Sequence, residues 1–242
     1  MDARAMVIDA ILEERIESVL PAMMRRTEID AWILVSREYN EDPILKTFLP
    51  SSWFSARRRT ILMIFDLGPD APLETLAVAR YAVGKQFKSA WDPESQPDQW
   101  RRVRELIDAR NPKRIGVNTS ETFALADGLT QTDHQALIAA LGPHAQKLVS
   151  AEHLGVGWLE TRSELERELY PEIVALAHRL IKRAFSREAI IPGETTTEAL
   201  EWWLRNAAAE QNLDLWFHPS ISKQSRQQDE ATAQAGSTSG LQ

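Results

Sequence analysis

The sequence predicts an α/β protein, because short apolar runs alternate with amphipathic segments over residues 1–150 of the 242-residue chain. The apolar fraction of 43% is ordinary for a globular protein and is sufficient to form a core. Turn residues, mainly proline, glycine, asparagine and aspartate, separate the apolar runs. These observations predict a mixed sheet with flanking helices.

The first part of this region predicts one helix and three strands. Apolar residues recur at helical spacing over 2–26, and we expect this face to pack on the sheet. Buried strands are expected at 30–36 and 60–66. A Gly-Pro-Asp turn follows the second of them, so 74–81 is expected to be its antiparallel partner. Between the first two strands, 37–59 is predicted to be a polar excursion.

The second part of the region alternates between helices and strands. An aspartate can cap a helix over 98–110, which an Asn-Pro pair then ends. A short strand is expected at 114–118. Two helices are predicted at 121–129 and 133–141, and a final strand at 146–150. None of this region contains a glycine-rich phosphate-binding motif.

The polar excursion combines aromatic residues with three consecutive arginines, at Trp53, Phe54 and Arg57-Arg58-Arg59. Such a combination could bind nucleic acid or an anionic ligand. The interpretation that we favour is a solvated loop with an aromatic anchor. The net charge of −7 supports it, because phosphate-backbone binding requires a basic excess. We therefore expect no nucleic-acid partner.

Residues 158–222 predict two further helices joined by a Pro-Gly turn. Ser163 and Glu166 have the spacing of a capping box at the start of the first helix. Pro171 is expected to kink this helix or break it briefly, because proline lacks an N–H and clashes with the preceding turn.

The second helix is expected to begin with another capping box, formed by Thr195 and Glu198. After it, the aromatic run from Leu215 predicts a strand. Residues 223–242 are dominated by polar and small residues, which cannot bury enough apolar area to offset their ordering entropy. We predict a disordered tail there.

Residues 158–222 resemble the start of the catalytic domain of the M24 metallopeptidase family, the creatinase and Xaa-Pro aminopeptidase group. The motifs that carry the resemblance are Trp158-Leu159-Glu160, Ser163-x-x-Glu166, Pro192-Gly193-x-Thr195-Thr196-x-Glu198, Trp202-Trp203 and Phe217-x-Pro219. The preceding region resembles, more loosely, the family's creatinase-type N-terminal domain. The resemblance implies such a domain at 1–150 and the first helices and first strand of an incomplete pita-bread domain at 151–222.

Members of that family bind two divalent metals, such as Mn, Co or Zn, through two aspartates, a histidine and two glutamates. All five ligands follow the strand that is expected at Leu215. The residues after Ser222 do not continue the pattern, so we expect no catalytic residue, no metal ligand and no cofactor in this chain. The abrupt change of composition there suggests a premature end or a deletion.

The parent function that the resemblance implies is metal-dependent cleavage of an N-terminal residue, often ahead of proline, or hydrolysis of a small C–N bond. We expect this chain to be a truncated and inactive form, with a peptide substrate only if the catalytic half were present. The alternative is a non-catalytic interaction or oligomerisation module derived from the N-terminal domain. A homo-oligomer fits that alternative.

Other features exclude several classes of site. No cysteine occurs, so disulfides and thiolate metal sites are excluded. No apolar run approaches the length of a membrane span and no signal peptide is recognisable, so a cytoplasmic location without membrane contact is expected. The histidines have no metal-binding spacing, and a functional role is not expected for any of them. They are His134, His144, His153, His178 and His218.

Two further expectations concern the end of the chain. The charged residues Glu160, Arg162 and Glu166 are expected to serve in helix capping and surface pairing. The aromatic residues Trp202, Trp203, Trp216 and Phe217 are expected to lack part of their cover. An exposed apolar patch of this kind favours self-association.

Overall fold

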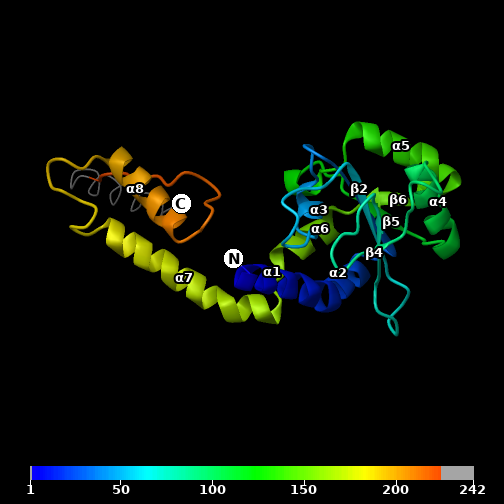
Figure 1. The fold of residues 1–242 in the computed structure, drawn as a ribbon, viewed down its shortest axis with the longest axis horizontal. Coiled ribbons are helices and arrows are strands. Elements are labelled where there is room, and N and C mark those ends of the chain that lie inside the picture. The colour runs from blue at the N-terminus through cyan, green and yellow to red at the C-terminus, as the bar shows by residue number, and fades with distance from the viewer. Residues whose placement is uncertain (1, 225–242) are drawn as a thin grey trace, which may run out of the picture. The chain divides into compact units, whose positions relative to one another are not determined.

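The computed structural model describes residues 2–224, and the chain divides into two compact units, Met1–Arg167 and Glu168–Gln242 (Figure 1). The first unit extends beyond residue 150, where the sequence placed the end of the N-terminal domain. It does so because the following helix, α6 (Glu152–Glu160), packs into its core. The assignment of 151–222 to a separate domain stays a prediction. So does the tail at 223–242, of which 225–242 lie outside the described residues.

The first unit is built on a six-stranded sheet with the order β4-β3-β2-β1-β5-β6. Its strands are β1 (Ala31–Arg37), β2 (Arg59–Phe65), β3 (Glu74–Val78), β4 (Lys88–Ser89), β5 (Ile115–Val117) and β6 (Leu148–Ser150). β2 is antiparallel to both β1 and β3, whereas β1–β5, β5–β6 and β3–β4 are parallel pairs. The predicted fold class, an α/β fold with a mixed sheet and flanking helices, is confirmed.

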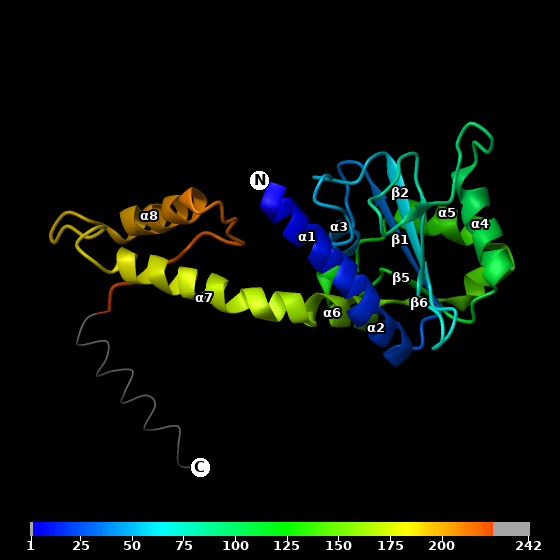
Figure 2. The ribbon, with the colours of Figure 1, turned by 60° about the horizontal axis from the view of Figure 1, so that its bottom comes forward.

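Helices cover both faces of this sheet (Figure 2). One face is covered by α1 (Asp2–Glu14), the π-helix η1 (Arg15–Val19), α2 (Leu20–Arg26), α3 (Pro43–Lys46) and α6. The other face is covered by α4 (Gln99–Arg110) and α5 (Gln131–Leu141). Two 3₁₀ segments, η2 (Ala124–Ala126) and η3 (Gly142–Lys147), lie on either side of α5 in the chain.

Alternation of side chains along β1 divides the apolar core between the two faces. Trp32 belongs to the core beneath the N-terminal helix, and Ile33 belongs to the core beneath α4 and α5. In the first core Phe48 stacks on Trp158 of α6, with 4.4 Å between the ring centroids. Aromatic stacking of this kind adds about 0.5–1.5 kcal/mol to the burial itself. Trp158, the first residue of the family-like motifs, therefore belongs to the core of the first unit.

The second unit contains α8 (Thr197–Glu210) and most of α7 (Glu164–Ala184). The two helices lie side by side (Figures 1 and 2), and Leu180 packs against Ala207 and Ala208 between them. The helix α7 continues through Pro171, which is exposed, so of the two alternatives expected there, a kink or a short break, the break is absent.

Several predicted elements are confirmed within a few residues. The helix at 2–26 forms, although its middle turn is a π-helix, and Asp98 caps α4 by accepting a hydrogen bond from the N–H of Arg101 at 3.1 Å. The box of Ser163 and Glu166 also forms, because the N–H of Ser163 donates to the Glu166 carboxylate at 2.9 Å. The antiparallel pairing of β2 with β3 is as expected.

Other predictions are wrong for local reasons. The helix expected at 121–129 is reduced to η2, because the hydroxyl of Ser120 accepts the N–H groups of Thr122 and Phe123 at 3.1 and 2.8 Å. Such side-chain bonds compete with helical ones. The short α3, β4 and the helix α6 were not foreseen.

Two predictions in the second unit are also wrong. The N-cap of α8 is Thr196, whose hydroxyl accepts from the N–H of Ala199 at 3.1 Å. The neighbouring Thr195 turns back and accepts from the N–H of Ile191 at 2.9 Å, which closes the Pro-Gly turn. No strand forms from Leu215 within the described residues. An aromatic run needs a neighbouring strand to bond with, and the described residues of this unit provide none.

Candidate functional site

A set of polar side chains converges at one edge of the sheet in the first unit. β1, β3, β4, β5 and β6 run parallel to one another, so their carboxyl ends share this edge with the amino end of β2. Ligands of α/β proteins commonly bind at such an edge, where the chain order reverses. Here the chain crosses from β4 through α4 to β5, on the far side of β1.

A buried polar network begins where β1 and β5 end. The indole N–H of Trp32 donates to the side-chain oxygen of Asn118 at 2.8 Å, and the Asn118 amide donates to both oxygens of Asp42 at 3.0 and 2.8 Å. The Asp42 carboxylate also accepts from the N–H of Leu45 and so caps α3. The hydroxyl of Ser36 accepts the N–H of Asp42 at 2.7 Å.

Burial raises the pKa of Asp42, and the hydrogen bonds from Leu45 and Asn118 oppose that change. The side chain is 0% exposed. A Cβ atom on Gly128 would lie 2.3 Å from one of its oxygens, so only glycine fits beside this carboxylate. Enclosed on all sides and fully hydrogen-bonded, Asp42 joins α3 to the sheet. It is not poised to exchange a proton with a ligand.

A second cluster lies at the same edge and reaches the surface. Arg37 and Arg59 occupy directly opposite positions on β1 and β2. The carboxylate of Asp133, at the start of α5, lies 2.9 Å from Nε of Arg37 and 3.2 Å from Nε of Arg59. Like charges that lie directly opposite on neighbouring strands repel each other. The Asp133 carboxylate offsets this repulsion between the two guanidinium groups. The tripeptide of arginines predicted to lie in a solvated loop therefore ends inside β2.

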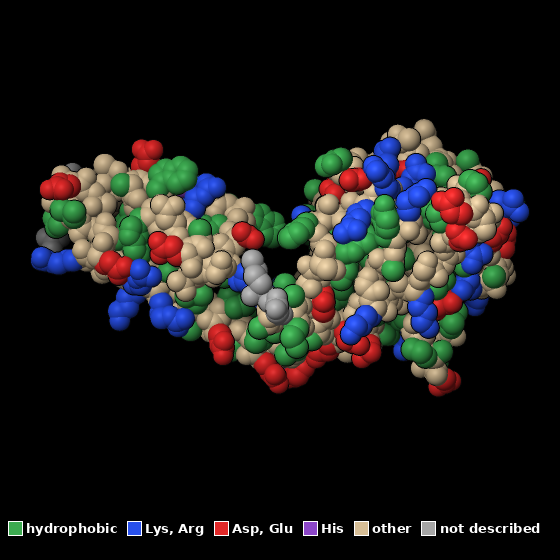
Figure 3. Space-filling model, viewed as in Figure 1, with side chains coloured by type: hydrophobic (Ala, Val, Ile, Leu, Met, Phe, Trp, Pro, Cys, Tyr) green, Lys and Arg blue, Asp and Glu red, His purple; other side chains and the backbone are tan. Residues whose placement is uncertain are grey.

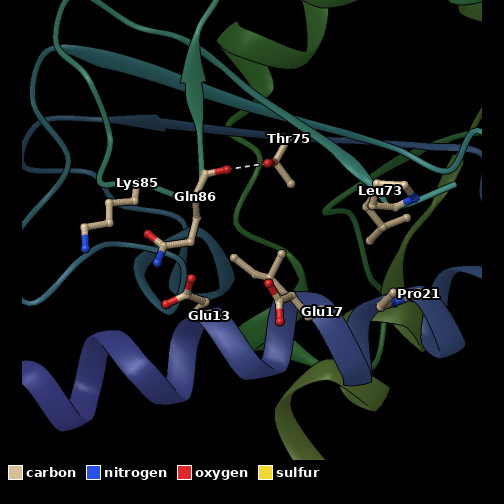
Figure 4. Close-up of a pocket in the computed structure, with 9 residues that line it drawn as sticks. Glu13, Glu17, Pro21, Leu73, Thr75, Lys85 and Gln86 are labelled. Atoms are coloured by element: carbon tan, nitrogen blue, oxygen red, sulfur yellow. Dashed lines mark hydrogen bonds between the residues drawn. The ribbon is translucent and has the colours of Figure 1, made fainter.

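A cavity of about 360 Å³ lies elsewhere in the first unit, between the N-terminal helix and the segment around β3 (Figure 4). Figure 4 shows Glu13 and Glu17 on the helix side and Lys85 and Gln86 opposite them. Apolar residues, including Leu73, complete the lining. The hydroxyl of Thr75 donates to the backbone carbonyl of Gln86, which holds this wall of the cavity to β3.

A third polar cluster joins the N-terminal helix to α6 and α7. Arg15 is 7% exposed, and its guanidinium donates to the carbonyl oxygens of Trp158 and Thr161 and to the Glu166 carboxylate. The same group lies 4.3 Å from the ring centroid of Trp158. Glu166 was expected in capping and surface pairing. It does cap α7, and its second partner is a buried arginine 151 residues away in the chain.

Arg162, which was expected to serve in the same capping and surface pairing, bonds to a residue close to it in the chain. Arg162 donates to the carbonyl of Leu159 at 2.8 Å.

Among the histidines, His144 lies 2.9 Å from the Asp108 carboxylate, and His218 lies 3.8 Å from Glu201 beside the ring of Trp202. No two of the five histidines come together in the described structure with a third ligand residue.

Residues 2–224 contain no group of three His, Cys, Asp or Glu side chains placed to hold a metal ion. None of the helices in this part of the chain is long and apolar enough to cross a membrane.

Comparison with protein-family models and with curated proteins gives no match. One similar solved structure is described as a Xaa-Pro dipeptidase from Bacillus anthracis. The identity is 14%, the TM-score is 0.49, and the alignment covers 81% of this chain and 49% of that chain. This chain therefore spans about half the length of that structure.

Proposed function

We propose that the chain is a creatinase-type N-terminal domain joined to the first two helices of an M24-type catalytic domain, and that it has no peptidase activity of its own. The order of the family-like motifs on the elements supports this proposal. Trp158 lies in α6, the Ser163 and Glu166 box begins α7, Pro192-Gly193 lies between α7 and α8, and Trp202-Trp203 lies in α8.

The sequence after this point supports the second part of the proposal. In the family that the chain resembles, two aspartates, a histidine and two glutamates hold the metals. Residues 223–242 contain Asp229 and Glu230 and no histidine. A two-metal centre needs bridging carboxylates fixed about 3.5–4 Å from both ions to activate water. Two adjacent acidic residues cannot supply that set.

The test is metal binding and turnover by the purified 242-residue chain. The protein is dialysed against Mn²⁺ or Co²⁺, its metal content is measured, and it is assayed on Xaa-Pro dipeptides beside an active M24 peptidase. We expect no stoichiometric metal and no hydrolysis. Two tightly bound ions per chain together with turnover would show that the chain is an enzyme.

A second candidate function is an oligomerisation module, and the exposed aromatic residues of the second unit favour it. Trp216 is 87% exposed and Phe217 is 76% exposed. Light scattering over a range of concentrations tests this function. The double change Trp216→Ser and Phe217→Ser should shift an oligomer toward monomer, while Tyr170→Ser, at another exposed aromatic residue, should not. A wild-type chain that stays monomeric would exclude it.

A further inference from the structure

The carboxyl edge of the sheet carries an unusual concentration of positive charge for a chain with a net charge of −7. Five residues make up what we call the arginine surface: Arg37, Arg57, Arg58, Arg59 and Arg80. Basic side chains gather over this end of the first unit in Figure 3. Their acidic neighbours are Asp133, Glu38 and Glu94. The surface therefore carries more arginines than carboxylates, against the balance of the whole chain.

The buried base of the surface leaves one positive charge in excess. Asp133, which is 2% exposed, is the carboxylate that faces both Arg37 and Arg59. Each arginine is about one-third exposed at its side chain, so both reach solvent. A single buried carboxylate holds the two guanidinium groups in place without neutralising both.

The Arg57 guanidinium lies 4.8 Å from the ring centroid of Trp53 and 5.7 Å from that of Tyr81. No carboxylate lies within ion-pair distance of Arg57 in the described part of the chain. A cation held over aromatic rings is attracted by their π-electrons and uses none of its N–H donors on a carboxylate. Arg57 is therefore fixed in position and still has donors for an incoming anion.

The outer part of the surface is weakly paired. The Arg80 guanidinium lies 3.9 Å from the Glu94 carboxylate, and both side chains are more than half exposed. The Arg58 guanidinium lies 3.4 Å from the Glu38 carboxylate, and the Arg58 side chain is also largely exposed. Exposed pairs of this kind contribute about 0–1 kcal/mol, so a better anionic partner can replace them.

We propose that the arginine surface binds a short acidic segment of another protein. Arginine forks match carboxylates in a bidentate geometry, and a stacked arginine loses little side-chain entropy on binding. Glu38 and Glu94 lie among the arginines and would repel a continuous phosphate backbone, whereas a short peptide can place its carboxylates between them.

The test uses a fluorescein-labelled octaglutamate peptide and anisotropy with the full chain. Saturable binding is expected at low salt, with affinity falling about tenfold or more between about 20 and 300 mM NaCl. The double change Arg57→Gln and Arg80→Gln should weaken binding about tenfold, because it removes the two arginines with no strong partner. The double change Arg57→Lys and Arg80→Lys should retain part of the affinity, since it keeps the charge without the fork.

A matched control separates this surface from general charge attraction. Arg4→Gln with Arg179→Gln removes the same charge from exposed positions elsewhere, and peptide affinity should be unchanged. Thermal melting confirms that each variant folds. Equal weakening by both double variants, absence of saturable binding, or tighter binding of a single-stranded oligonucleotide would overturn the proposal. Salt-sensitive dimerisation through the same arginines would also overturn it, because the partner would then be a second copy.

Discussion

At the scale of the residue, a carboxylate enclosed by the fold differs from one that caps a helix in solvent. Asp42 and Asp98 both cap a helix, and Asp42 is buried whereas Asp98 is exposed. Asp42→Ala removes a cap and leaves the buried amide of Asn118 without its acceptor. We expect a loss of about 2–4 kcal/mol of unfolding free energy, from roughly 1 for the cap and 1–3 for the orphaned donors.

Asp98→Ala is the matched control and should cost only about 1 kcal/mol, because solvent can replace the lost cap. Urea unfolding followed by tryptophan fluorescence measures both values. Equal losses for the two variants would show that the network around Asn118 contributes no stability beyond capping.

A second residue-scale prediction concerns pH. The hydrogen bond from Arg110, at 2.6 Å from Nη2 to Oε1, holds the pKa of Glu74 below its ordinary value. A carboxylate with a lowered folded-state pKa contributes stability above its unfolded pKa of about 4.3, and this contribution is lost as pH falls through the folded value. Glu74→Gln should therefore lower the unfolding free energy at pH 7 and make it fall less steeply below about pH 4.

Unfolding free energies at several pH values between neutral and acid measure this difference. Glu121→Gln serves as a control, since Glu121 is exposed and forms no ion pair with a described residue. A profile for Glu74→Gln that runs parallel to the wild-type profile at acid pH would contradict the assignment.

At the scale of the element, the sequence predicts what depends on local periodicity and misses what depends on distant partners. The strands at 31–37 and 59–65 are recognisable because each contains a run of five consecutive apolar residues. The two-residue β4 is not, because its pairing with β3 alone defines it. The aromatic run at Leu215 is the opposite case, a strand that was predicted but does not form in the described residues. High strand propensity does not produce a strand where no neighbouring strand is present.

The N-cap of α8 shows that residue types alone do not locate a helix cap to within one residue. Thr195, Thr196 and Thr197 are equivalent by residue type, and only the path of the Pro-Gly turn selects Thr196 as the cap. Thr196→Ala should therefore cost about 1 kcal/mol of helix stability, whereas Thr197→Ala, inside the helix, should be near neutral or slightly stabilising. Helicity by circular dichroism during thermal unfolding measures both. A larger loss at Thr197 would place the cap one residue later.

At the scale of the whole molecule, residues far apart in sequence define both the core and the candidate sites. The arginine tripeptide was visible in the sequence, but Arg37, Arg80 and Asp133 come from other segments of the chain and only the fold assembles them. Arginines recur at the ends of predicted strands, at 37, 59 and 80, and this recurrence is the signal that could have located the surface. The partnership of Arg15 with Glu166 had no such signal.

That partnership leads to a prediction for the stability of the first unit. Arg15→Met keeps most of the apolar stem but leaves two carbonyl oxygens and the Glu166 carboxylate without their donor. We expect a loss of about 3 kcal/mol, as for other broken buried pairs. Arg25→Met breaks an exposed pair with Asp66 and should cost less than about 1 kcal/mol in the same urea titration. Similar costs would contradict a structural role for Arg15.

The pairing of β1 between β2 and β5 has a consequence for biosynthesis. β2 follows β1 closely in the chain, but the other edge of β1 pairs with Ile115–Val117. While the ribosome is still producing the intervening segment, β1 of the nascent protein has one open edge, which is a template for aberrant pairing between chains. Slow translation before codon 115 would lengthen that vulnerable interval, and a chaperone that shields the open edge would have its greatest effect then.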